Sequence, residues 1–322
     1  MPDLLIWIAV FVVTLITLII SADFFIKASE RIGLAAGIPP FIVGVTLIAI
    51  GTSLPELITS IVAVSKSYES SSIVIGNVIG SNITNIGLVL GIVGITARKI
   101  KLDFDVMRVD LPMMIASTFI LFLCILDGQF SLFEGLVCLL GLSVYLAYVF
   151  NLGKSEQADE KLLSEDDEPP LSWFTWKEPI ILLTSAAVIY LSAKYNVEAI
   201  VHLADIMEIG QEFIALTAVA LGTSLPELVV SIVAVKTNNA EMAVGNILGS
   251  NIFNIFAVMG IPRIFGEIDI PESIMGYSMP ALIVISLICL FVVQDREVNK
   301  WEGWILFLFY TLFIGNLVFM QM

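Results

Sequence analysis

Long apolar runs restrict the folds open to this chain more than any other feature. Several runs reach 18 residues or more, which is about the length that an α-helix needs to cross a bilayer. A transmembrane barrel would instead show strands of about ten residues with alternating apolar and polar positions. The composition agrees with helices in a membrane, because 58% of the residues are hydrophobic and 14% are charged, whereas a soluble domain is about one quarter charged. We therefore expect an all-α integral membrane protein.

Ten apolar windows, separated by charged or polar breaks, are long enough to be membrane spans. We predict helices at residues 4–26, 38–65, 71–96, 109–127, 131–152, 177–194, 209–235, 240–262, 274–293 and 302–321. The first window is too long for the apolar region of a signal peptide, so we expect it to stay in the mature protein.

The basic residues predict how these spans are oriented, because Lys and Arg in short loops favour the cytoplasmic side. With the N-terminus outside, twelve of the fifteen basic residues fall on the cytoplasmic side, and only Lys66, Lys194 and Arg263 fall outside. We therefore expect a multi-pass protein of the cell (inner) membrane with both termini extracytoplasmic. The net charge of −15 argues against a nucleic-acid partner.

A hydrophilic segment lies between the fifth and sixth windows. Residues 153–168 hold seven acidic residues and two lysines, and Pro169 and Pro170 follow. This composition is typical of a solvated linker, and the segment lacks the spacing of an EF-hand loop, which favours a spacer over a calcium-binding regulator. We predict a first half over 1–152, an acidic cytoplasmic linker over 153–173 and a second half over 174–322.

The two halves carry the same motifs. GTSLPEL at 51–57 recurs at 222–228, SIVAV at 60–64 recurs at 231–235, GNVIGSNI at 76–83 is matched by GNILGSNI at 245–252, and Asn85 corresponds to Asn254. Each half has five predicted spans, an odd number, so the second half must enter the membrane from the opposite side. Inverted repeats with discontinuous helices at the centre are typical of secondary transporters. A channel stays open as an alternative, whereas an intramembrane enzyme is disfavoured because the chain has no HExxH motif and a single histidine.

Each GTSLPE motif combines a proline with oxygen-bearing side chains. Pro55 and Pro226 lack an amide N–H, so we expect carbonyls near Ala49 and Ala220 to be freed from helical hydrogen bonds. Glu56 and Glu227 place carboxylates at membrane depth, at a cost of about 2.5–3.5 kcal/mol each on insertion scales unless a cation offsets it. Hydroxyl and amide oxygens nearby complete the candidate ligands: Thr52, Ser53, Thr223, Ser224, Ser81, Asn85, Ser250 and Asn254. Such hard oxygen ligands suit Ca²⁺, could also suit Na⁺, and do not suit zinc or copper.

Structural roles are expected for several other residues. We expect Asn77 and Asn246 to join helices by hydrogen bonds, His202 to lie at the membrane interface, and Asp23 to pair with Lys27. Glycines in the GNxxG motifs should allow close helix approach: Gly76, Gly80, Gly245 and Gly249. The cysteines are far apart in sequence and are predicted to be packing residues rather than a disulfide framework: Cys124, Cys138 and Cys289.

The paired GTSLPEL and GSNxxN motifs resemble the alpha-repeats of the calcium/cation antiporter superfamily, in particular the prokaryotic sodium/calcium exchangers. The resemblance covers residues 41–92 and 212–261. It implies an antiporter that needs no cofactor and exchanges Na⁺ for Ca²⁺ by alternating access, with Glu56 and Glu227 binding the ions in turn. It further implies that the first span of each half moves against the motif-bearing core. Proton-coupled exchange at the same site and a monomeric carrier remain open.

Overall fold

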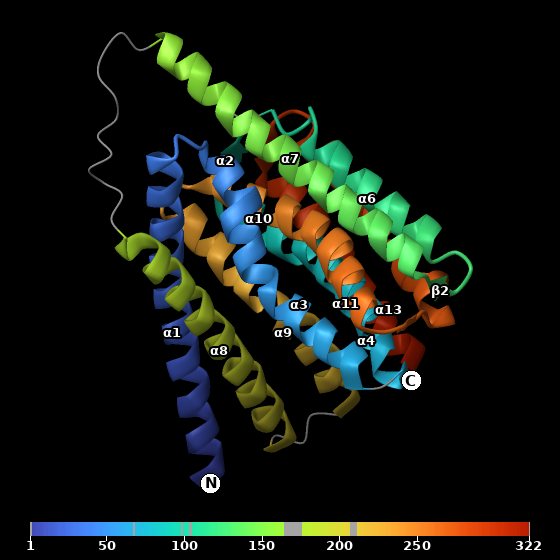
Figure 1. Ribbon diagram of the computed structural model, residues 1–322. Coiled ribbons are helices and arrows are strands. Elements are labelled where there is room, and N and C mark those ends of the chain that lie inside the picture. Colours follow the sequence, from blue (N-terminus) through green and yellow to red (C-terminus); the bar gives the residue numbers. More distant parts are fainter. Residues whose placement is uncertain are drawn as a thin grey trace.

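The computed structural model is a bundle of helices with two short ribbons of strands (Figure 1). It describes residues 2–66, 68–97, 99–102, 105–163, 176–206 and 211–321. The α-helices are α1 (Pro2–Ala35), α2 (Pro40–Val43), α3 (Ala49–Lys66), α4 (Tyr68–Thr84), α5 (Gly91–Ala97), α6 (Asp110–Cys124), α7 (Leu132–Leu163), α8 (Lys177–Ile206), α9 (Gln211–Lys236), α10 (Ala240–Phe253), α11 (Met259–Phe265), α12 (Met279–Val293) and α13 (Lys300–Gln321). The π-helical segments are η1 (Gly44–Ile48), η2 (Asn85–Leu90), η4 (Asn254–Val258) and η5 (Ile274–Ser278), and the strands are β1 (Lys99–Lys101), β2 (Gln129–Phe130), β3 (Ile268–Asp269) and β4 (Glu297–Asn299).

Helical residues occupy all ten windows predicted as spans. Within the described residues, six helices are long and apolar enough to cross a membrane. They cover Leu4–Ala35, Pro40–Ser65, Ile73–Ala97, Leu132–Asn151, Ala240–Phe265 and Ile274–Val293. The prediction of an all-α integral membrane protein is therefore confirmed, while the count of ten spans stays a prediction.

Several helices are longer than their predicted windows. Helix α1 continues to Ala35, nine residues past its window, because its charged end is held by ion pairs: Lys27 with Asp23 at 2.7 Å and Arg31 with Glu178 of α8 at 2.9 Å. Helix α7 continues to Leu163, so residues 153–163 of the predicted linker are helical. The remaining predicted linker residues, 164–173, lie outside the described residues. Hydropathy marks where a chain leaves an apolar environment, and a helix can continue beyond that point.

Pro55 and Pro226 do not interrupt their helices, because α3 and α9 continue through the two prolines. The irregularity lies next to the motifs instead, where η1 precedes α3 and where η2 and η4 begin at Asn85 and Asn254. Proline is tolerated in membrane helices because neighbouring groups satisfy the carbonyl that loses its amide partner. Short π-helical turns are frequently found at functional sites.

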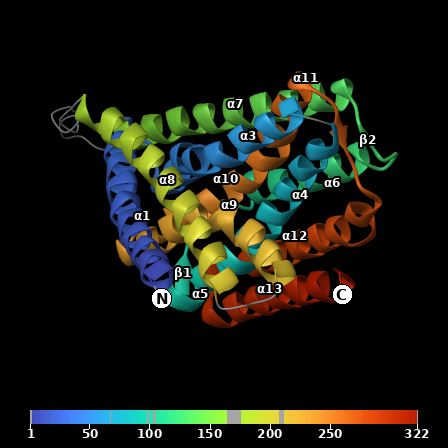
Figure 2. The same cartoon turned by 90° about the horizontal axis from the view of Figure 1, so that it is seen from below.

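The motif-bearing helices α3, α4, α9 and α10 lie in the middle of the bundle, and α1 and α8 run side by side along one flank (Figure 2). Side-chain contacts join this pair along its length. Asn196 Nδ2 of α8 donates to the Phe11 carbonyl at 3.0 Å and to Thr14 Oγ1 at 2.9 Å, Arg31 pairs with Glu178, and the Trp7 and His202 rings stack 4.0 Å apart. His202 thus connects α1 to α8.

Each ribbon joins one strand from each half. Strand β1 pairs antiparallel with β4, and β2 pairs antiparallel with β3. Because β1 precedes α6 and β2 follows it, the two ribbons lie at opposite ends of that helix. Strands β1 and β3 lie 169 residues apart, which is also the spacing of Ser81 and Ser250, and β2 and β4 are related in the same way. The two ribbons are therefore equivalent when the halves are exchanged.

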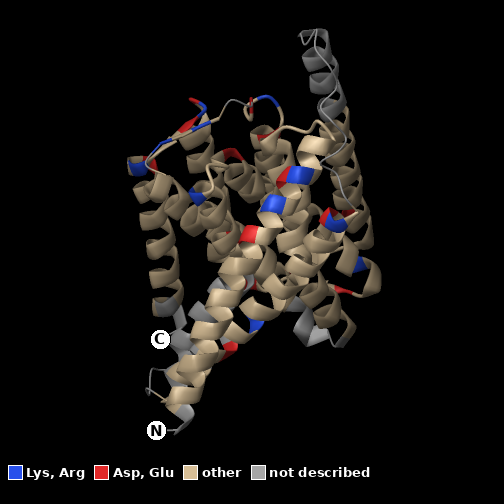
Figure 3. Cartoon of the chain, turned by 90° about the vertical axis from the view of Figure 1, so that its left-hand side faces the viewer, with Lys and Arg blue, Asp and Glu red and all other residues tan. Residues whose placement is uncertain are grey.

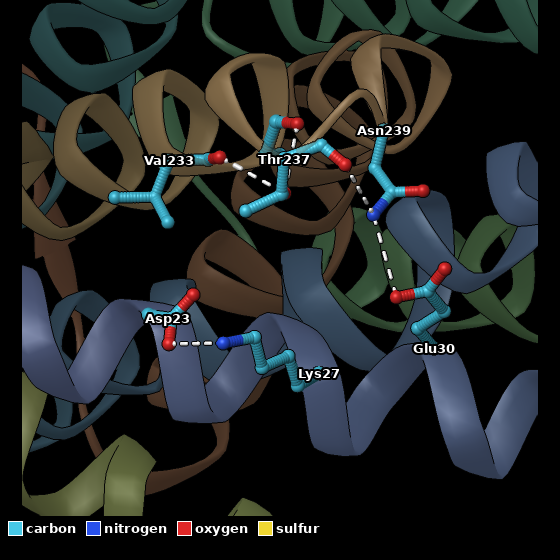
Figure 4. Close-up of polar contacts among 7 residues, drawn as sticks. Asp23, Lys27, Glu30, Val233, Thr237 and Asn239 are labelled. Atoms are coloured by element: carbon cyan, nitrogen blue, oxygen red, sulfur yellow. Dashed lines mark hydrogen bonds and ion pairs between the residues drawn. The ribbon is translucent and has the colours of Figure 1, made fainter.

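In Figure 3 many of the charged positions lie in the loops at the upper end of the bundle, and others lie within helices. Figure 4 shows the predicted pair of Asp23 and Lys27 on α1, together with a second contact at the same end. Asn239 Nδ2, in the turn between α9 and α10, donates to Glu30 Oε2 at 3.4 Å. The charged end of α1 is thus connected to the core helices as well as to α8.

The cysteines are free thiols within apolar helices, as expected for packing residues. Their separation in sequence is misleading, however, because α6 and α7 bring the thiols of Cys124 and Cys138 close enough to influence each other. Cys289 is fully buried in α12.

Candidate cation-binding site

Glu56 of α3 and Glu227 of α9 are buried in the middle of the bundle, with 1% and 0% of their surfaces exposed. Neither oxygen of Glu56 has a hydrogen-bond donor among the described residues. Glu227 Oε1 accepts a hydrogen bond from Ser53 Oγ at 3.4 Å, and its Oε2 has no donor. The two carboxylates are close enough for their charges to repel each other, and the ion pairs among the described residues include neither. Burying two such charges is costly without a compensating cation.

Ala49, Thr52 and Ser250 bring oxygen atoms from both halves to one place. Thr52 Oγ1 lies 3.4 Å from the Ala49 carbonyl oxygen and 3.2 Å from Asn246 Oδ1. Ser250 Oγ lies 3.5 Å from the same carbonyl oxygen and 3.4 Å from the same amide oxygen. A hydroxyl has one proton to donate, so each of these oxygens keeps lone pairs for a further partner. The predicted ligands of α3 and α10 therefore do come together.

Asn246 also has the role expected for it, because its Nδ2 donates to Ser231 Oγ at 3.0 Å and so joins α10 to α9. The equivalent atoms of the first half, Asn77 Nδ2 and Ser60 Oγ, are buried and have no hydrogen-bond partner among the residues described. The same sequence therefore makes different contacts in the two halves.

Asn85 and Asn254 are fully buried, and each donates a hydrogen bond to an asparagine of the opposite half. Asn85 Nδ2 donates to Asn251 Oδ1 at 3.3 Å, and Asn254 Nδ2 donates to Asn82 Oδ1 at 3.2 Å. The carbonyl oxygens of Asn85 and Asn254 have no donor. Sequence reasoning missed Asn82 and Asn251, although their identity in both GSN motifs was a signal that could have identified them.

The remaining predicted ligands are placed less completely. Ser81 and Ser224 are buried in α4 and α9, and Ser224 Oγ has no hydrogen-bond partner. Ala220 and Thr223 belong to α9, but their side chains lie outside the described residues.

Within the part of the chain that the structure describes, six buried side-chain oxygens of the predicted ligands have no hydrogen-bond donor: both oxygens of Glu56, Glu227 Oε2, Ser224 Oγ, Asn85 Oδ1 and Asn254 Oδ1. Oxygen atoms of this kind are what Ca²⁺, which takes about six to eight oxygen ligands, requires. The described residues contain no group of three or more His, Cys, Asp or Glu side chains able to hold a metal ion. The centre therefore suits a hard cation bound by two carboxylates and neutral oxygens.

Comparison with known proteins extends the likeness beyond these motifs. The family model described as "Sodium/calcium exchanger protein" matches residues 6–151 and 177–319. The sodium/calcium exchanger MaX1 of Methanosarcina acetivorans is 33% identical over 335 residues, covering 93% of this chain and 95% of the relative. The inner membrane protein YrbG of Escherichia coli is 34% identical over 294 residues, covering 87% of this chain and 88% of the relative.

The fold has a counterpart among solved structures. The sodium-calcium exchanger NCX_Mj, in a crystal soaked with 2.5 mM Na⁺ and 0.1 mM Ca²⁺, matches with a TM-score of 0.80 at 30% sequence identity. The match covers 97% of this chain and 98% of that one. The likeness therefore includes both halves and the way they pack.

Proposed function

Since this chain belongs to the sodium/calcium exchanger protein family, we propose that Glu56 and Glu227 bind Na⁺ and Ca²⁺ in turn while the protein carries the two ions in opposite directions across the membrane. The family consists of transporters rather than enzymes, and the exchanged ions are its substrates, so the chemistry needs no cofactor.

One observation carries this mechanism: the two buried glutamates have unpartnered oxygens and no basic partner among the described ion pairs. A single Ca²⁺ neutralises two carboxylates, and Na⁺ ions that occupy the same oxygens offset the same charge. Because the two kinds of cation need the same negative charges, they compete for the site, and competition for one site is the basis of exchange. The proton-coupled alternative has no comparable support, since the family description names sodium.

The architecture proposed for this exchange is ten spans in two inverted halves, over 1–152 and 174–322, joined by a cytoplasmic linker. The equivalence of the two ribbons under exchange of the halves supports it. So does the position of the N-terminal end of α1 and the C-terminal end of α13 at the same end of the bundle (Figures 1 and 3). Both glutamates come from one chain, so a monomer contains the whole proposed site.

The proposed conformational step is movement of α1 and α8, as one unit, against the core. The contacts of Asn196, Glu178 and His202 support joint movement because they connect the two helices along their length. Phe25 of α1 would transmit the movement to the motif. A Cβ atom on Gly51 would lie 2.5 Å from Phe25 Cζ, so the ring packs directly on the GTSLPE segment.

The test is calcium uptake into proteoliposomes driven in turn by outward sodium, potassium and proton gradients. We expect the sodium gradient to drive uptake in the parent protein, and Glu56→Gln or Glu227→Gln to abolish it, because each removes one of the two charges. Glu198→Gln, on the exposed surface of α8, is the matched control and should keep full activity. Full activity in either site variant would disprove the assignment. Uptake driven by the proton gradient alone would favour proton coupling, and rapid flux without a counter-ion would indicate a channel.

A further inference from the structure

Asn82 and Asn251 lie beside the cation site but have no role in the function proposed so far. They are equivalent in the two halves, and each has 1% of its surface exposed. Each lies three residues before a proposed ligand, Asn85 or Asn254, at which the helix becomes π-helical. Fully buried amides must be satisfied by hydrogen bonds, so the partners of these two side chains are informative.

The hydrogen bonds cross between the halves. Asn85 Nδ2 of the first half donates to Asn251 Oδ1 of the second at 3.3 Å. Asn254 Nδ2 of the second half donates to Asn82 Oδ1 of the first at 3.2 Å. Exchanging the two halves converts one bond into the other, so the two hydrogen bonds are equivalent by the internal repeat.

The NH₂ groups of Asn82 and Asn251 fix the direction of these hydrogen bonds, because each NH₂ group already donates to an acceptor elsewhere. Asn82 Nδ2 donates to the backbone carbonyl of Asn251 at 3.2 Å, and a carbonyl can only accept. Asn251 Nδ2 donates to the Met114 sulfur at 3.7 Å, and a thioether can also only accept. Both amides are therefore held with their carbonyl oxygens facing the neighbouring ligand asparagine.

A ligand asparagine that meets a carbonyl oxygen must turn its NH₂ group toward it. Asn85 and Asn254 accordingly direct their own carbonyl oxygens away from the bond, and these two oxygens are buried without a donor. A carbonyl oxygen attracts a cation, whereas an NH₂ group in the same place would repel it. We infer that Asn82 and Asn251 are positioning residues that hold the carbonyl oxygens of Asn85 and Asn254 toward the transported cations. The inference rests on the function proposed above.

The competing explanation is that Asn82 and Asn251 only fill space between helices. Replacement by leucine separates the two explanations, because leucine has a similar size but neither donates nor accepts a hydrogen bond. With Asn82→Leu or Asn251→Leu, the facing ligand amide is free to turn its NH₂ group toward the cation. We expect the dissociation constant for Ca²⁺ to rise about ten-fold, which corresponds to about 1.4 kcal/mol of lost ligand interaction.

The experiment titrates Ca²⁺ into the purified full-length protein by calorimetry and measures sodium-driven uptake and thermal unfolding on the same samples. Weaker Ca²⁺ binding, with a higher half-saturating Ca²⁺ concentration and little change in maximal rate, is the expected result for Asn82→Leu and Asn251→Leu. Asn316→Leu on α13 makes the same chemical change away from the site and should leave all three readouts unchanged. Met114→Leu conserves volume and removes only the sulfur acceptor, so it should weaken Ca²⁺ binding in the same direction by a smaller factor.

Unchanged Ca²⁺ affinity in the variants that fold would overturn the inference, and so would a loss of maximal rate or stability at unchanged affinity. If Asn251→Leu does not fold, Met114→Leu provides the same comparison for Asn251. Because binding is measured without transport, failure of the inference is distinct from failure of the proposed exchange, which would appear as absent sodium-driven uptake in the parent.

Discussion

Replacing Gly249 by alanine should disturb the cation site through helix packing alone. A Cβ atom at this position would lie 2.4 Å from the Val45 carbonyl oxygen and 2.8 Å from Ala49 Cβ. Real Cβ contacts essentially never fall below 3.0 Å, so α10 and η1 must separate by roughly 0.6 Å or more. The Val45 oxygen belongs to the backbone, and no side-chain rotation can relieve the contact.

The steric cost should exceed the intrinsic benefit of alanine. Overpacking a tight contact costs about 1–3 kcal/mol, whereas Gly→Ala within a helix gains about 0.5–1 kcal/mol. The separation would also reach the site, because Ser250 follows Gly249 and its Oγ is already 3.5 Å from the Ala49 carbonyl oxygen. Gly80 is the equivalent glycine of the first half, and among the side chains and backbone that the structure describes nothing lies within 4 Å of a Cβ atom placed there. Gly80→Ala should therefore gain the helix preference of alanine without a steric cost.

Thermal unfolding in detergent and sodium-driven calcium uptake at varied Ca²⁺ concentration would test this reasoning. We expect Gly249→Ala to unfold at a lower temperature and to need more Ca²⁺ for half-maximal uptake. We expect Gly80→Ala to unfold at the parent temperature or above it. Equal behaviour of the two variants would refute the argument, because only the surroundings distinguish the two positions.

Two further variants test other buried contacts. Tyr145→Phe removes the hydroxyl that donates to Asp110 Oδ1 at 2.9 Å. Because Asp110 is 0% exposed, leaving its carboxyl without this donor should lower the stability by about 1–3 kcal/mol. An unchanged unfolding temperature would contradict this expectation. Asn196→Leu removes both bonds from α8 to α1. It should change the maximal rate of uptake and leave the apparent Ca²⁺ affinity unchanged, and the opposite pattern in the uptake kinetics would argue against joint movement of the two helices.

The candidate cation site could be proposed from the sequence because its motif occurs twice. Glu56 and Glu227 occur in identical strings, and a duplicated carboxylate at membrane depth has few structural explanations. The roles of Asn82 and Asn251 were not predictable, because they depend on which side chain of the opposite half each amide faces. Spacing along one helix identifies a shared face but carries no information on partners from another helix.

The positions of helix ends and irregularities were predicted less well, for physical reasons. Ion pairs carry α1 beyond its apolar window to Ala35, and α7 continues into the acidic segment, because helix formation does not require an apolar environment. The prolines directed attention to carbonyls within the GTSLPE motifs, yet π-helical turns begin at Asn85 and Asn254. Proline chemistry shows where an amide is missing, whereas tertiary contacts determine where the helix changes its hydrogen bonding.

Identical motif residues of the two halves make different hydrogen bonds and packing contacts. In the second half, Asn246 bonds to Ser231 and Gly249 packs on the Val45 carbonyl. In the first half, the equivalent Asn77 and Ser60 atoms have no hydrogen-bond partner among the described residues, and no described atom lies within 4 Å of a Cβ placed on Gly80. If α4 took up the packing of α10 while α10 released it, the hydrogen bonds and close packing of one half would re-form in the other. Such an exchange would bring the two states close in free energy, which is the condition under which ion binding can decide between them.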